Sequence, residues 1–350
     1  MRHPVLYVLH SSQLYGTERM ALATARGLAD EFETIFIAPP GAALVEAERL
    51  GFQTCRYRTS KDLALVLGPL LKRYPSLTFV ATGPRYNLVC IALNVFYRRR
   101  IKQIQMVHGG AGLRKDYARK KVLNLFNITF VVVSPWSKQM LIDHGVRRPI
   151  HVITNFLAPE MAAKLPRRAK YDQSGVRKVV LVSRVDPVKR LDVLLDALDR
   201  RPKELDDLSF RVFGLGPDLE KLRERARRTH PNVQFAGFSD NVAAELAGAD
   251  LLLHTCPIEP FGLAILEAMA ARVAALVPDQ GGATTLIDDG VSGFTFRADN
   301  PDHLAQRLLE LKQAPAELLN RMVANASAKV DAEFSASAAL QRYREVFAPD

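Results

Sequence analysis

Short apolar segments alternate with helical stretches along the chain, and this alternation restricts the fold more than any other feature. Successive parallel strands need a crossover, usually a helix, so the pattern predicts parallel sheets covered by helices on both faces. The first series of expected strands is 5–10, 34–38, 52–57, 77–81, 103–107, 129–133 and 151–154. The second series is 178–183, 209–213, 233–235, 250–254, 273–277 and 294–296. We therefore expect an α/β protein with two doubly wound parallel sheets.

A division into two domains fits the size of the chain. With 350 residues and 48% hydrophobic content, the chain can bury two cores of ordinary size. Residues 156–177 lose the periodicity and gather Pro, basic and polar residues, so we expect a linker there. The expected Rossmann-like domains are residues 1–155 and 178–333. Ligands of such sheets bind at the carboxyl ends of strands, and the two domains are expected to face a common cleft.

The N-terminal half is strongly basic. Residues 1–150 hold 22 Lys and Arg against 9 Asp and Glu, whereas residues 151–350 hold 26 against 28. This excess indicates a polyanionic partner such as membrane lipid, a phosphorylated acceptor or nucleic acid. Apolar segment 88–102 ends in a cationic run, which fits an anionic bilayer surface or, alternatively, a core helix with a solvated end. We expect no nucleic acid, because no aromatic-rich strand of an RNA-binding module is present.

We expect neither a targeting segment nor a cysteine-based metal or disulfide framework in this sequence. The first residues contain an apolar run too short for a secretory signal, and eighteen apolar residues never occur together. Cys55, Cys90 and Cys256 are too widely spaced for a zinc motif or a disulfide framework. We expect a cytoplasmic protein without a metal centre or cofactor, with peripheral contact at the inner face of the cell membrane as an option.

The segment HTCPIEPFGLAILEAMAA, residues 254–271, is the leading candidate for a binding site. It follows an expected strand, and two prolines stiffen the loop before Gly262 starts an apolar helix. The first-turn amides of Gly262, Leu263 and Ala264 are free donors at the positive end of that helix, which suits phosphate oxygens. An ordinary amphipathic helix explains the segment equally well.

Two glutamates of this segment, Glu259 and Glu267, are eight positions apart. In a continuous helix they would lie about 12 Å apart at about 1.5 Å per residue. Paired glycosidase carboxyls are roughly 5 to 9.5 Å apart, so these two are not expected to be a hydrolytic pair. Instead, Glu267 can accept from a ribose diol, and Glu259 can contact sugar hydroxyls.

Other polar and glycine residues also follow expected strands. Arg184 ends one strand, and Lys189 is expected to open the next helix, so that both cations suit a pyrophosphate. Solvated surface cations are the alternative. Gly214, in FGLGPDLEKL, permits close approach by a ligand, although a tight turn explains it as well because the third glycine of a dinucleotide motif is missing.

In the N-terminal half, Gly16 follows the first strand, so its amide can approach a phosphate. Thr17 is expected to cap the helix over 17–29. His108 ends a strand before the sequence GGAG, where an imidazole can donate to a sugar hydroxyl or stabilise charge. A structural role for this histidine is equally open.

With these residues assembled, the chain resembles the retaining glycosyltransferases of family 4, also called glycosyl transferases group 1. The resemblance covers nearly the whole length and is most specific over residues 178–293. It implies the GT-B fold, with a C-terminal helix, residues 334–350, that returns to the N-terminal domain. The family signatures match the following residues: Glu259 and Glu267, Arg184 and Lys189, Gly214 and Gly216, Gly281 and Gly282, Gly16 with Glu18, and His108.

The resemblance implies roles for these residues. Catalytic roles fall to His108, Arg184, Lys189 and Glu259, and donor binding falls to Gly16, Gly214, Phe261, Gly262, Leu263 and Glu267. The implied reaction transfers a hexose from a nucleoside-diphosphate sugar to a carbohydrate or glycolipid acceptor, with retention and without an obligatory metal. The departing phosphate itself is expected to help deprotonate the acceptor.

The chain departs from the family pattern at three positions. Arg190 replaces a glycine, Phe156 follows Asn155 where glycine is common, and Thr285 stands where a glutamate often occurs. These departures bear on the sugar pocket. Two other functions remain open from the sequence: a nucleotide-sugar epimerase of the same architecture, and a non-catalytic subunit that binds nucleotide sugars or membranes.

Overall fold

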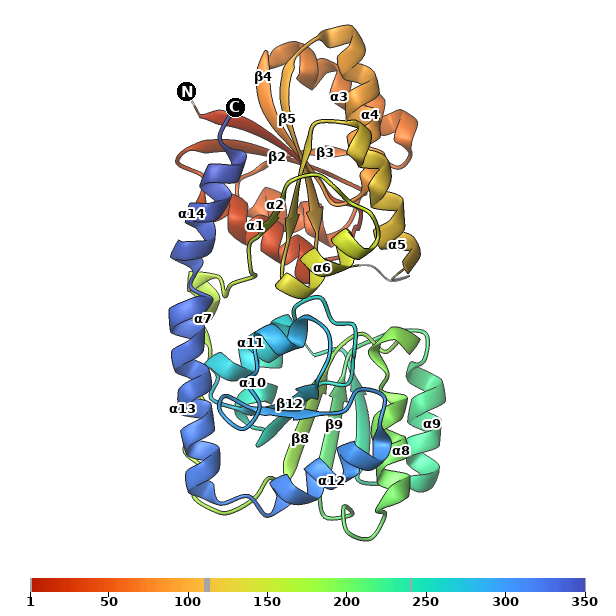
Figure 1. The fold of residues 1–350 in the computed structure, drawn as a ribbon, viewed down its shortest axis with the longest axis vertical. Coiled ribbons are helices and arrows are strands. Elements are labelled where there is room, and N and C mark those ends of the chain that lie inside the picture. Colours follow the sequence, from red (N-terminus) through yellow and green to blue (C-terminus); the bar gives the residue numbers. More distant parts are fainter. Residues whose placement is uncertain (1, 110–113, 240, 350) are drawn as a thin grey trace. The chain divides into compact units, whose positions relative to one another are not determined.

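The computed structural model describes residues 2–109, 114–239 and 241–349. The chain forms two compact units (Figure 1). Unit 1 comprises Met1–Phe156 and Ala336–Asp350, and unit 2 comprises Leu157–Ser335. The segment expected as a linker therefore starts unit 2, and it contains one short helix, α7 (Pro159–Lys164).

Unit 1 is a seven-stranded parallel sheet with the order β3-β2-β1-β4-β5-β6-β7. Its strands are β1 (His3–Val8), β2 (Phe32–Ala38), β3 (Gln53–Arg56), β4 (Ser76–Ala81), β5 (Arg100–Val107), β6 (Ile128–Val132) and β7 (Ile150–Val152). Its helices are α1 (Gly16–Gly27), α2 (Ala42–Arg49), α3 (Ser60–Arg73), α4 (Pro84–Tyr97), α5 (Arg114–Arg119), η1 (Lys120–Leu125), α6 (Pro135–Asp143) and α14 (Ala336–Phe347). The strand order reverses between β1 and β4, which is where sheets of this type bind ligands.

The C-terminal helix α14, blue in Figure 1, belongs to unit 1. The hydroxyl of Thr78 donates to the carbonyl of Phe347 at 2.7 Å, and Lys102 Nζ donates to the carbonyl of Ala348 at 2.8 Å. The Phe347 ring meets the Phe32 ring edge to face at 6.0 Å. These contacts confirm the expected return of the last helix to the N-terminal domain.

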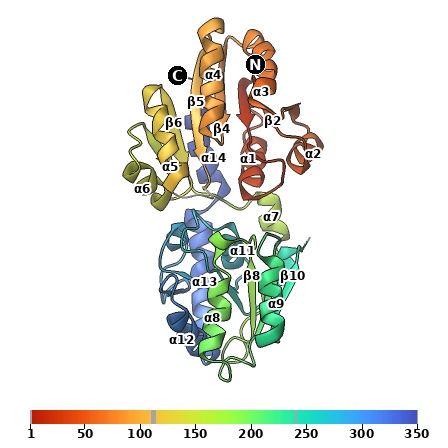
Figure 2. The same cartoon turned by 90° about the vertical axis from the view of Figure 1, so that its right-hand side faces the viewer.

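Unit 2 is a six-stranded parallel sheet with the order β10-β9-β8-β11-β12-β13. Figure 2 labels β8 and β10 of this sheet. Its strands are β8 (Lys178–Val182), β9 (Ser209–Phe213), β10 (Val233–Gly237), β11 (Leu251–Leu253), β12 (Ala274–Pro278) and β13 (Phe294–Phe296). Its other helices are η2 (Pro187–Lys189), α8 (Asp192–Arg200), α9 (Leu219–Thr229), α10 (Val242–Ala247), α11 (Leu263–Ala270), η3 (Gly282–Thr285), α12 (Pro301–Lys312) and α13 (Ala316–Glu333). The order reverses here between β8 and β11.

The centre of unit 2 is anchored by apolar strands that are buried on both faces. All three leucines of β11 are buried, as are Val179, Val180 and Leu181 in the neighbouring strand β8. Burying a leucine or valine side chain stabilises the fold by about 1.5–3 kcal/mol. The loops that leave the carboxyl ends of β8 and β11 therefore start from a rigid platform.

The structure confirms the two doubly wound sheets, but two local expectations were wrong. Thr17 lies inside α1, and the capping position is Tyr15, whose side chain makes no capping hydrogen bond. Lys189 ends the short 3-10 turn η2 rather than opening a helix, and α8 begins at Asp192. The cause is Arg190, whose left-handed backbone (φ 51°) interrupts helical geometry between the two elements.

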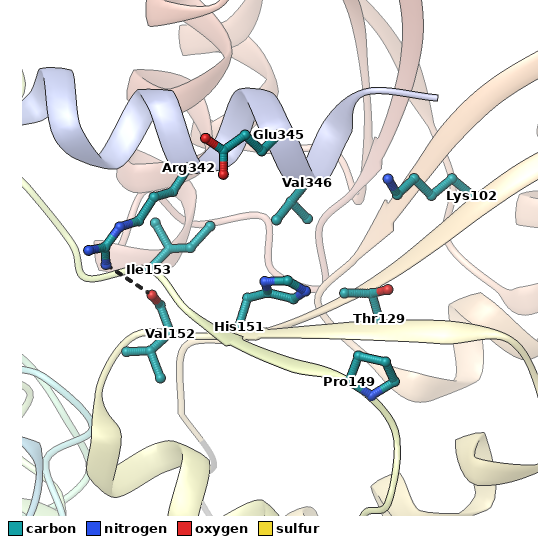
Figure 3. A pocket seen from close by; sticks show the side chains of 9 residues that line it. All are labelled: Lys102, Thr129, Pro149, His151, Val152, Ile153, Arg342, Glu345 and Val346. Carbon is teal, nitrogen blue, oxygen red and sulfur yellow. Dashed lines mark hydrogen bonds between the residues drawn. The ribbon is translucent and has the colours of Figure 1, made fainter. Parts of the chain in front are cut away.

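A cavity of about 490 Å³ lies in unit 1 beside α14 (Figure 3). Lys102, Thr129 and Pro149 lie at the amino ends of strands β5, β6 and β7, and α14 contributes Arg342 and Glu345. Ligands of doubly wound sheets bind at the opposite, carboxyl edge, so this cavity is separate from the candidate site described below. In the described part of the chain, no helix combines the length and apolar character needed to cross a membrane.

Candidate functional site

The reversal of strand order in unit 2 brings two predicted segments together. β8 and β11 are neighbours in the sheet, so the loop after β8, which carries Arg184 and Lys189, lies beside the loop after β11, which carries Glu259. The carboxyl ends of parallel strands share one edge, and a crevice opens there when adjacent connections leave to opposite faces. The sequence placed these residues at strand ends, and the topology explains why they meet.

A largely buried ion pair lies at this edge. Lys189 Nζ donates to Glu259 Oε2 at 2.6 Å, and the two side chains are 17% and 15% exposed. Burial alone would raise the pKa of Glu259, but the Lys189 ammonium outweighs it and holds the pKa well below its ordinary value. Burial opposes the charge of Lys189 as well, and Glu259 raises the pKa of Lys189. Both groups are therefore charged at neutral pH.

A second acid, Asp186, organises the turn that carries the two cations. Arg184 Nη2 lies 2.8 Å from one oxygen of Asp186, while the other oxygen accepts from the Lys189 amide at 3.2 Å. Asp186 is thus both the counter-ion of Arg184 and the cap of the turn η2. The Arg184 side chain is about half exposed, so its ion pair exchanges readily for an anionic ligand.

The loop after β11 is held in place by hydrogen bonds with two neighbouring segments, the turn after β8 and η3. The hydroxyl of Thr255 donates to the Lys189 carbonyl at 2.7 Å, and the amide of Gly282 donates to the Glu259 carbonyl at 2.6 Å. A Cβ atom on Gly282 would collide with the carbonyl oxygen of Pro260, so this approach requires glycine. The loop that presents Glu259 is therefore preorganised by both the β8 turn and η3.

Helix α11 starts at the expected place, with Gly262 as its N-terminal cap. Gly262 has a left-handed backbone (φ 101°), which glycine adopts without strain. The amides of Ile265 and Leu266 donate to the Gly262 carbonyl, so the amides that precede them have no acceptor within the helix. This end of the helix is positive and can bind a phosphate.

The side chains of the remaining candidates in α11 and just before it differ in accessibility. The Phe261 ring is buried against Phe334 at 5.7 Å, so its backbone is the part that can reach a ligand. Glu267 lies in the middle of α11 and is partly exposed. The roles of both residues, and of Leu263, stay predictions.

The glycine turn after β9 has a structural explanation. A Cβ on Gly214 would collide with the carbonyl oxygen of Ser183, and one on Gly216 would collide with that of Val185. The amide of Val185 donates to the carbonyl of Leu215 at 3.0 Å, so the backbones of the loops after β8 and β9 are hydrogen-bonded to each other. Close backbone packing thus requires both glycines, and ligand contact by Gly214 stays a prediction.

Unit 1 places His108 directly after β5, beside the loop that follows β1. Burial lowers the pKa of His108 to about 4, with a smaller contribution from His10, so its imidazole is neutral at pH 7. Its Nε2 atom is buried and has no hydrogen-bond partner among the described residues. His10 Nδ1 lies 3.1 Å from the hydroxyl of Thr82, which joins the β1 and β4 loops. The residues 110–112, which supply most of the expected GGAG loop, lie outside the described part.

Gly16 is the first residue of α1, so its amide lies at the positive end of a twelve-residue helix. Glu18, expected on the same ligand-facing loop, is instead buried, with 1% exposure and one oxygen lacking a hydrogen-bond partner in the described residues. Burial raises the pKa of Glu18 to about 7. Glu18 belongs to the interior of unit 1.

Sequence reasoning missed two members of the unit 2 cluster. His254 is the first residue after β11, and its Nε2 lies 3.4 Å from Glu259 Oε2 without forming a hydrogen bond. Like His108, His254 is a histidine at the end of an expected strand, so the same signal was present in the sequence. Asp186 precedes Pro187, and an Asp-Pro pair is a typical start of a helical turn, so this signal was also available.

The three departures from the family pattern lie in different surroundings. The left-handed conformation of Arg190 is one that glycine adopts most easily, and ion pairs with Asp192 and Asp299 hold the arginine there. Phe156 is buried at the end of unit 1. Thr285 ends the 3-10 turn η3.

Comparisons with known proteins agree with this geometry. The family profile of glycosyl transferases group 1 matches residues 166–329. Poly(glycerol-phosphate) alpha-glucosyltransferase of Bacillus subtilis (strain 168) is 31% identical over 137 residues, which are 38% of this chain and 20% of that protein. GDP-mannose-dependent alpha-(1-6)-phosphatidylinositol monomannoside mannosyltransferase of Mycobacterium tuberculosis (strain CDC 1551 / Oshkosh) is 30% identical over 174 residues, which are 47% of this chain and 45% of that protein. The chain thus spans less than half the length of these two relatives.

Among solved structures, Anabaena Alr3699/HepE in complex with UDP and glucose is similar over nearly the whole chain. The TM-score is 0.80 at 20% sequence identity, and the similarity covers 97% of this chain and 98% of that one. The likeness therefore extends to both units. Residues 166–329, which carry the unit 2 site, thus match the family of glycosyl transferases group 1, and the chain has the GT-B fold.

Proposed function

We propose that the chain is a retaining glycosyltransferase that transfers a hexose from a nucleoside-diphosphate sugar to a glycolipid or envelope polysaccharide precursor. The observation that carries the proposal is the Lys189–Glu259 pair at the carboxyl edge of unit 2, beside Arg184 and the positive end of α11. A diphosphate needs cations and amides, and a sugar needs a carboxylate acceptor. This edge supplies both.

Donor binding would rearrange the ion pairs of this edge. A diphosphate competes with Glu259 for the Lys189 ammonium and with Asp186 for Arg184. The released Glu259 carboxylate then accepts hydrogen bonds from donor-sugar hydroxyls, while Glu267 accepts from the ribose. The ion pairs of the free protein thus hold each side chain near its ligand position.

In the proposed reaction, the bond between the sugar and the distal phosphate breaks, and the phosphate oxygen takes the negative charge. Lys189, Arg184 and the α11 amides stabilise that charge, which is where most of the acceleration would arise. The departing phosphate accepts the acceptor proton, and the new bond forms on the same face of the sugar. Because protein cations supply the charge stabilisation, we propose that neither a cofactor nor an obligatory metal is required.

Unit 1 supports an anionic acceptor at a membrane surface. Residues 51–150 hold 18 Lys and Arg against 3 Asp and Glu. Phe96 and Leu125 are 83% and 80% exposed, and cations lie close to each in the sequence, Arg98 and Lys121. A groove of about 800 Å³ contains Leu125 together with Lys121 and two arginines. Exposed apolar side chains among cations are typical of peripheral contact with anionic lipid.

The relatives point to the same class of acceptor. The names of the Bacillus and Mycobacterium enzymes include a glycerol-phosphate polymer and a phosphatidylinositol mannoside. Both are phosphodiesters, and the second is a lipid. We therefore propose a phosphodiester-containing, membrane-associated acceptor, with the protein in the cytoplasm and peripherally attached to the inner face of the membrane.

The donor is best identified by protection against thermal unfolding. A ligand that binds the native state at about 100 times its Kd stabilises that state by about 2.7 kcal/mol. We expect one class among UDP-, GDP- and ADP-sugars to raise the Tm of the wild-type chain and to lose this effect in Lys189→Met. Protection that is equal in both proteins would contradict the proposed donor site.

Incubation of the protected donor with and without acceptor separates transfer from epimerisation. A glycosyltransferase releases nucleoside diphosphate in step with acceptor glycosylation. An epimerase would instead convert the donor sugar alone, and a non-catalytic subunit would leave the donor intact in both reactions.

A further inference from the structure

Three side chains with metal-ligating atoms lie together in the loop that follows β11. His254 Nε2, Cys256 Sγ and a carboxylate oxygen of Glu259 all lie within 4.8 Å of one another. The distance between His254 Nε2 and Glu259 Oε2 is 3.4 Å. Two ligand atoms about 2.1 Å from a tetrahedral zinc ion are about 3.4 Å apart, so this pair already has the spacing of two ligands.

Two of these side chains have coordination capacity that the fold does not use. His254 is 6% exposed, and its Nε2 has no hydrogen-bond partner in the described part of the chain. Cys256 is 1% exposed, and its thiol makes a weak hydrogen bond to the Val188 carbonyl at 3.2 Å.

We propose that His254, Cys256 and Glu259 form a binding site for Zn²⁺ or a similar thiophilic divalent cation. Nitrogen, sulfur and carboxylate ligands together suit zinc, whereas magnesium and calcium prefer oxygen alone. The widest separation, up to 4.8 Å, must close by about 1 Å, because a sulfur and a second ligand of tetrahedral zinc are about 3.6 Å apart. Coordination replaces the thiol proton, which passes to solvent.

The ion would bind in competition with Lys189. The Lys189 ammonium lies 2.6 Å from Glu259 Oε2, and a divalent cation cannot share that oxygen with it at such a distance. Zinc binding therefore separates the Lys189–Glu259 pair. The ion also occupies the Glu259 carboxylate, which can then no longer accept from donor-sugar hydroxyls. If the proposed function is correct, zinc therefore acts as an inhibitor of donor-sugar binding rather than as a catalyst. This consequence rests on the proposed function, whereas the binding of the ion does not.

The test is a Co²⁺ titration of the chelator-treated full chain, followed by competition with Zn²⁺. We expect one ion per chain and a thiolate-to-cobalt charge-transfer band. Cys256→Ser should abolish the band, and His254→Gln should weaken binding at least by the roughly tenfold that a lost outer-shell partner already costs. Cys55→Ser, which removes a thiol of unit 1, is the matched control and should retain both band and affinity. Thermal unfolding of each variant checks its fold.

The competition gives a second and independent readout. Lys189→Met removes the ammonium that repels the ion, so this variant should bind Co²⁺ and Zn²⁺ more tightly than the wild type. A wild-type chain without a thiolate band, or affinities unchanged by Cys256→Ser and His254→Gln, would overturn the proposal, as would weaker binding in Lys189→Met. If the chain binds cobalt but transfers no sugar, the proposed metal site stands and the proposed function is contradicted.

Discussion

Each unit buries a glutamate in the region that follows an inner strand, and the two glutamates differ in their partners. In unit 2, Glu259 pairs with Lys189 at 2.6 Å, and its pKa is far below the ordinary value. In unit 1, Glu18 lies in the first turn of α1 with one unsatisfied oxygen, and burial raises its pKa to about 7. A partner cation thus decides whether a buried acid is fully charged at neutral pH or only partly ionised, as Glu18 is.

The cations at the carboxyl edges of the two sheets also differ in whether a carboxylate lies next to them. Arg184 and Lys189 in unit 2 each contact a carboxylate, so the charge of both cations is compensated until an anion binds. In unit 1, His10 follows β1 and Arg85 lies in the first turn of α4, which contains no acidic residue. Partial burial and then the Arg85 charge lower the pKa of His10. His10 is therefore disfavoured as a cation, and Arg85 supplies positive charge at this edge before any ligand arrives, which favours an anionic acceptor.

The largest expected effect is the loss of transfer in Lys189→Met. This variant removes a phosphate-stabilising cation and leaves Glu259 as a buried, unpaired charge. We expect kcat/KM to fall by about 10²–10³, as for the loss of one preorganised donor in other enzymes. Lys329→Met is the matched control, because Lys329 is similarly buried and pairs with Asp288 elsewhere in unit 2. An equal loss in both variants would remove Lys189 from the proposed site.

The next effect is a pH-dependent stabilisation in Glu18→Gln. The pKa of Glu18 is about 7 in the folded chain and near 4.5 when unfolded, so stability is lost as pH rises through this window. We expect the free energy of unfolding of the variant, relative to wild type, to improve by about 2.5 kcal/mol between about pH 5 and about pH 8. Chemical denaturation at the two pH values measures this difference. A constant difference would show that Glu18 is charged in the folded state.

The sequence predicted the fold because local pattern and topology agree. Every expected strand, for example 209–213 and 294–296, corresponds to a strand of the structure. The helix starts were less predictable, because they depend on single backbone angles. Arg190 has a positive φ although arginine rarely adopts one, and this angle moves the start of α8 to Asp192.

The position of the candidate site was predictable from the sequence, but the pairing of its charged side chains was not. Arg184, Lys189 and Glu259 could be chosen because each follows an expected strand, and the carboxyl ends of parallel strands lie at one edge of the sheet. Spacing along the chain does not reveal that Lys189 reaches Glu259, which is 70 residues away. Cysteine spacing argued against a zinc motif, yet Cys256 meets His254 and Glu259 within one loop. Ligand sets of this kind depend on the loop conformation rather than on a repeated sequence motif.

A smaller effect is expected from Arg85→Met at the edge of unit 1. The guanidinium lies 4.7 Å from the Tyr86 ring centre and donates to the Tyr86 hydroxyl at 2.6 Å, which leaves further donors for an anion. Loss of one charge-assisted hydrogen bond should raise the acceptor KM about tenfold and leave the donor KM unchanged. Arg49→Met is the control, because Arg49 is exposed and pairs with Glu46. A change in the donor KM alone would contradict the division of roles between the units.

The smallest effect concerns membrane contact and compares one exposed lysine from each unit. Lys121 lies in η1 of unit 1 near Leu125, whereas Lys221 lies in α9 of unit 2. Each basic residue at an anionic surface contributes about 1 kcal/mol, so Lys121→Ser should weaken vesicle binding about fivefold. Sedimentation with vesicles that contain anionic lipid measures this change, and neutral vesicles or added salt should abolish binding of the wild type. Lys221→Ser should leave vesicle binding unchanged. If it weakens binding as much as Lys121→Ser does, the basic residues of unit 1 do not form the membrane contact, and their excess charge would contribute to acceptor binding alone.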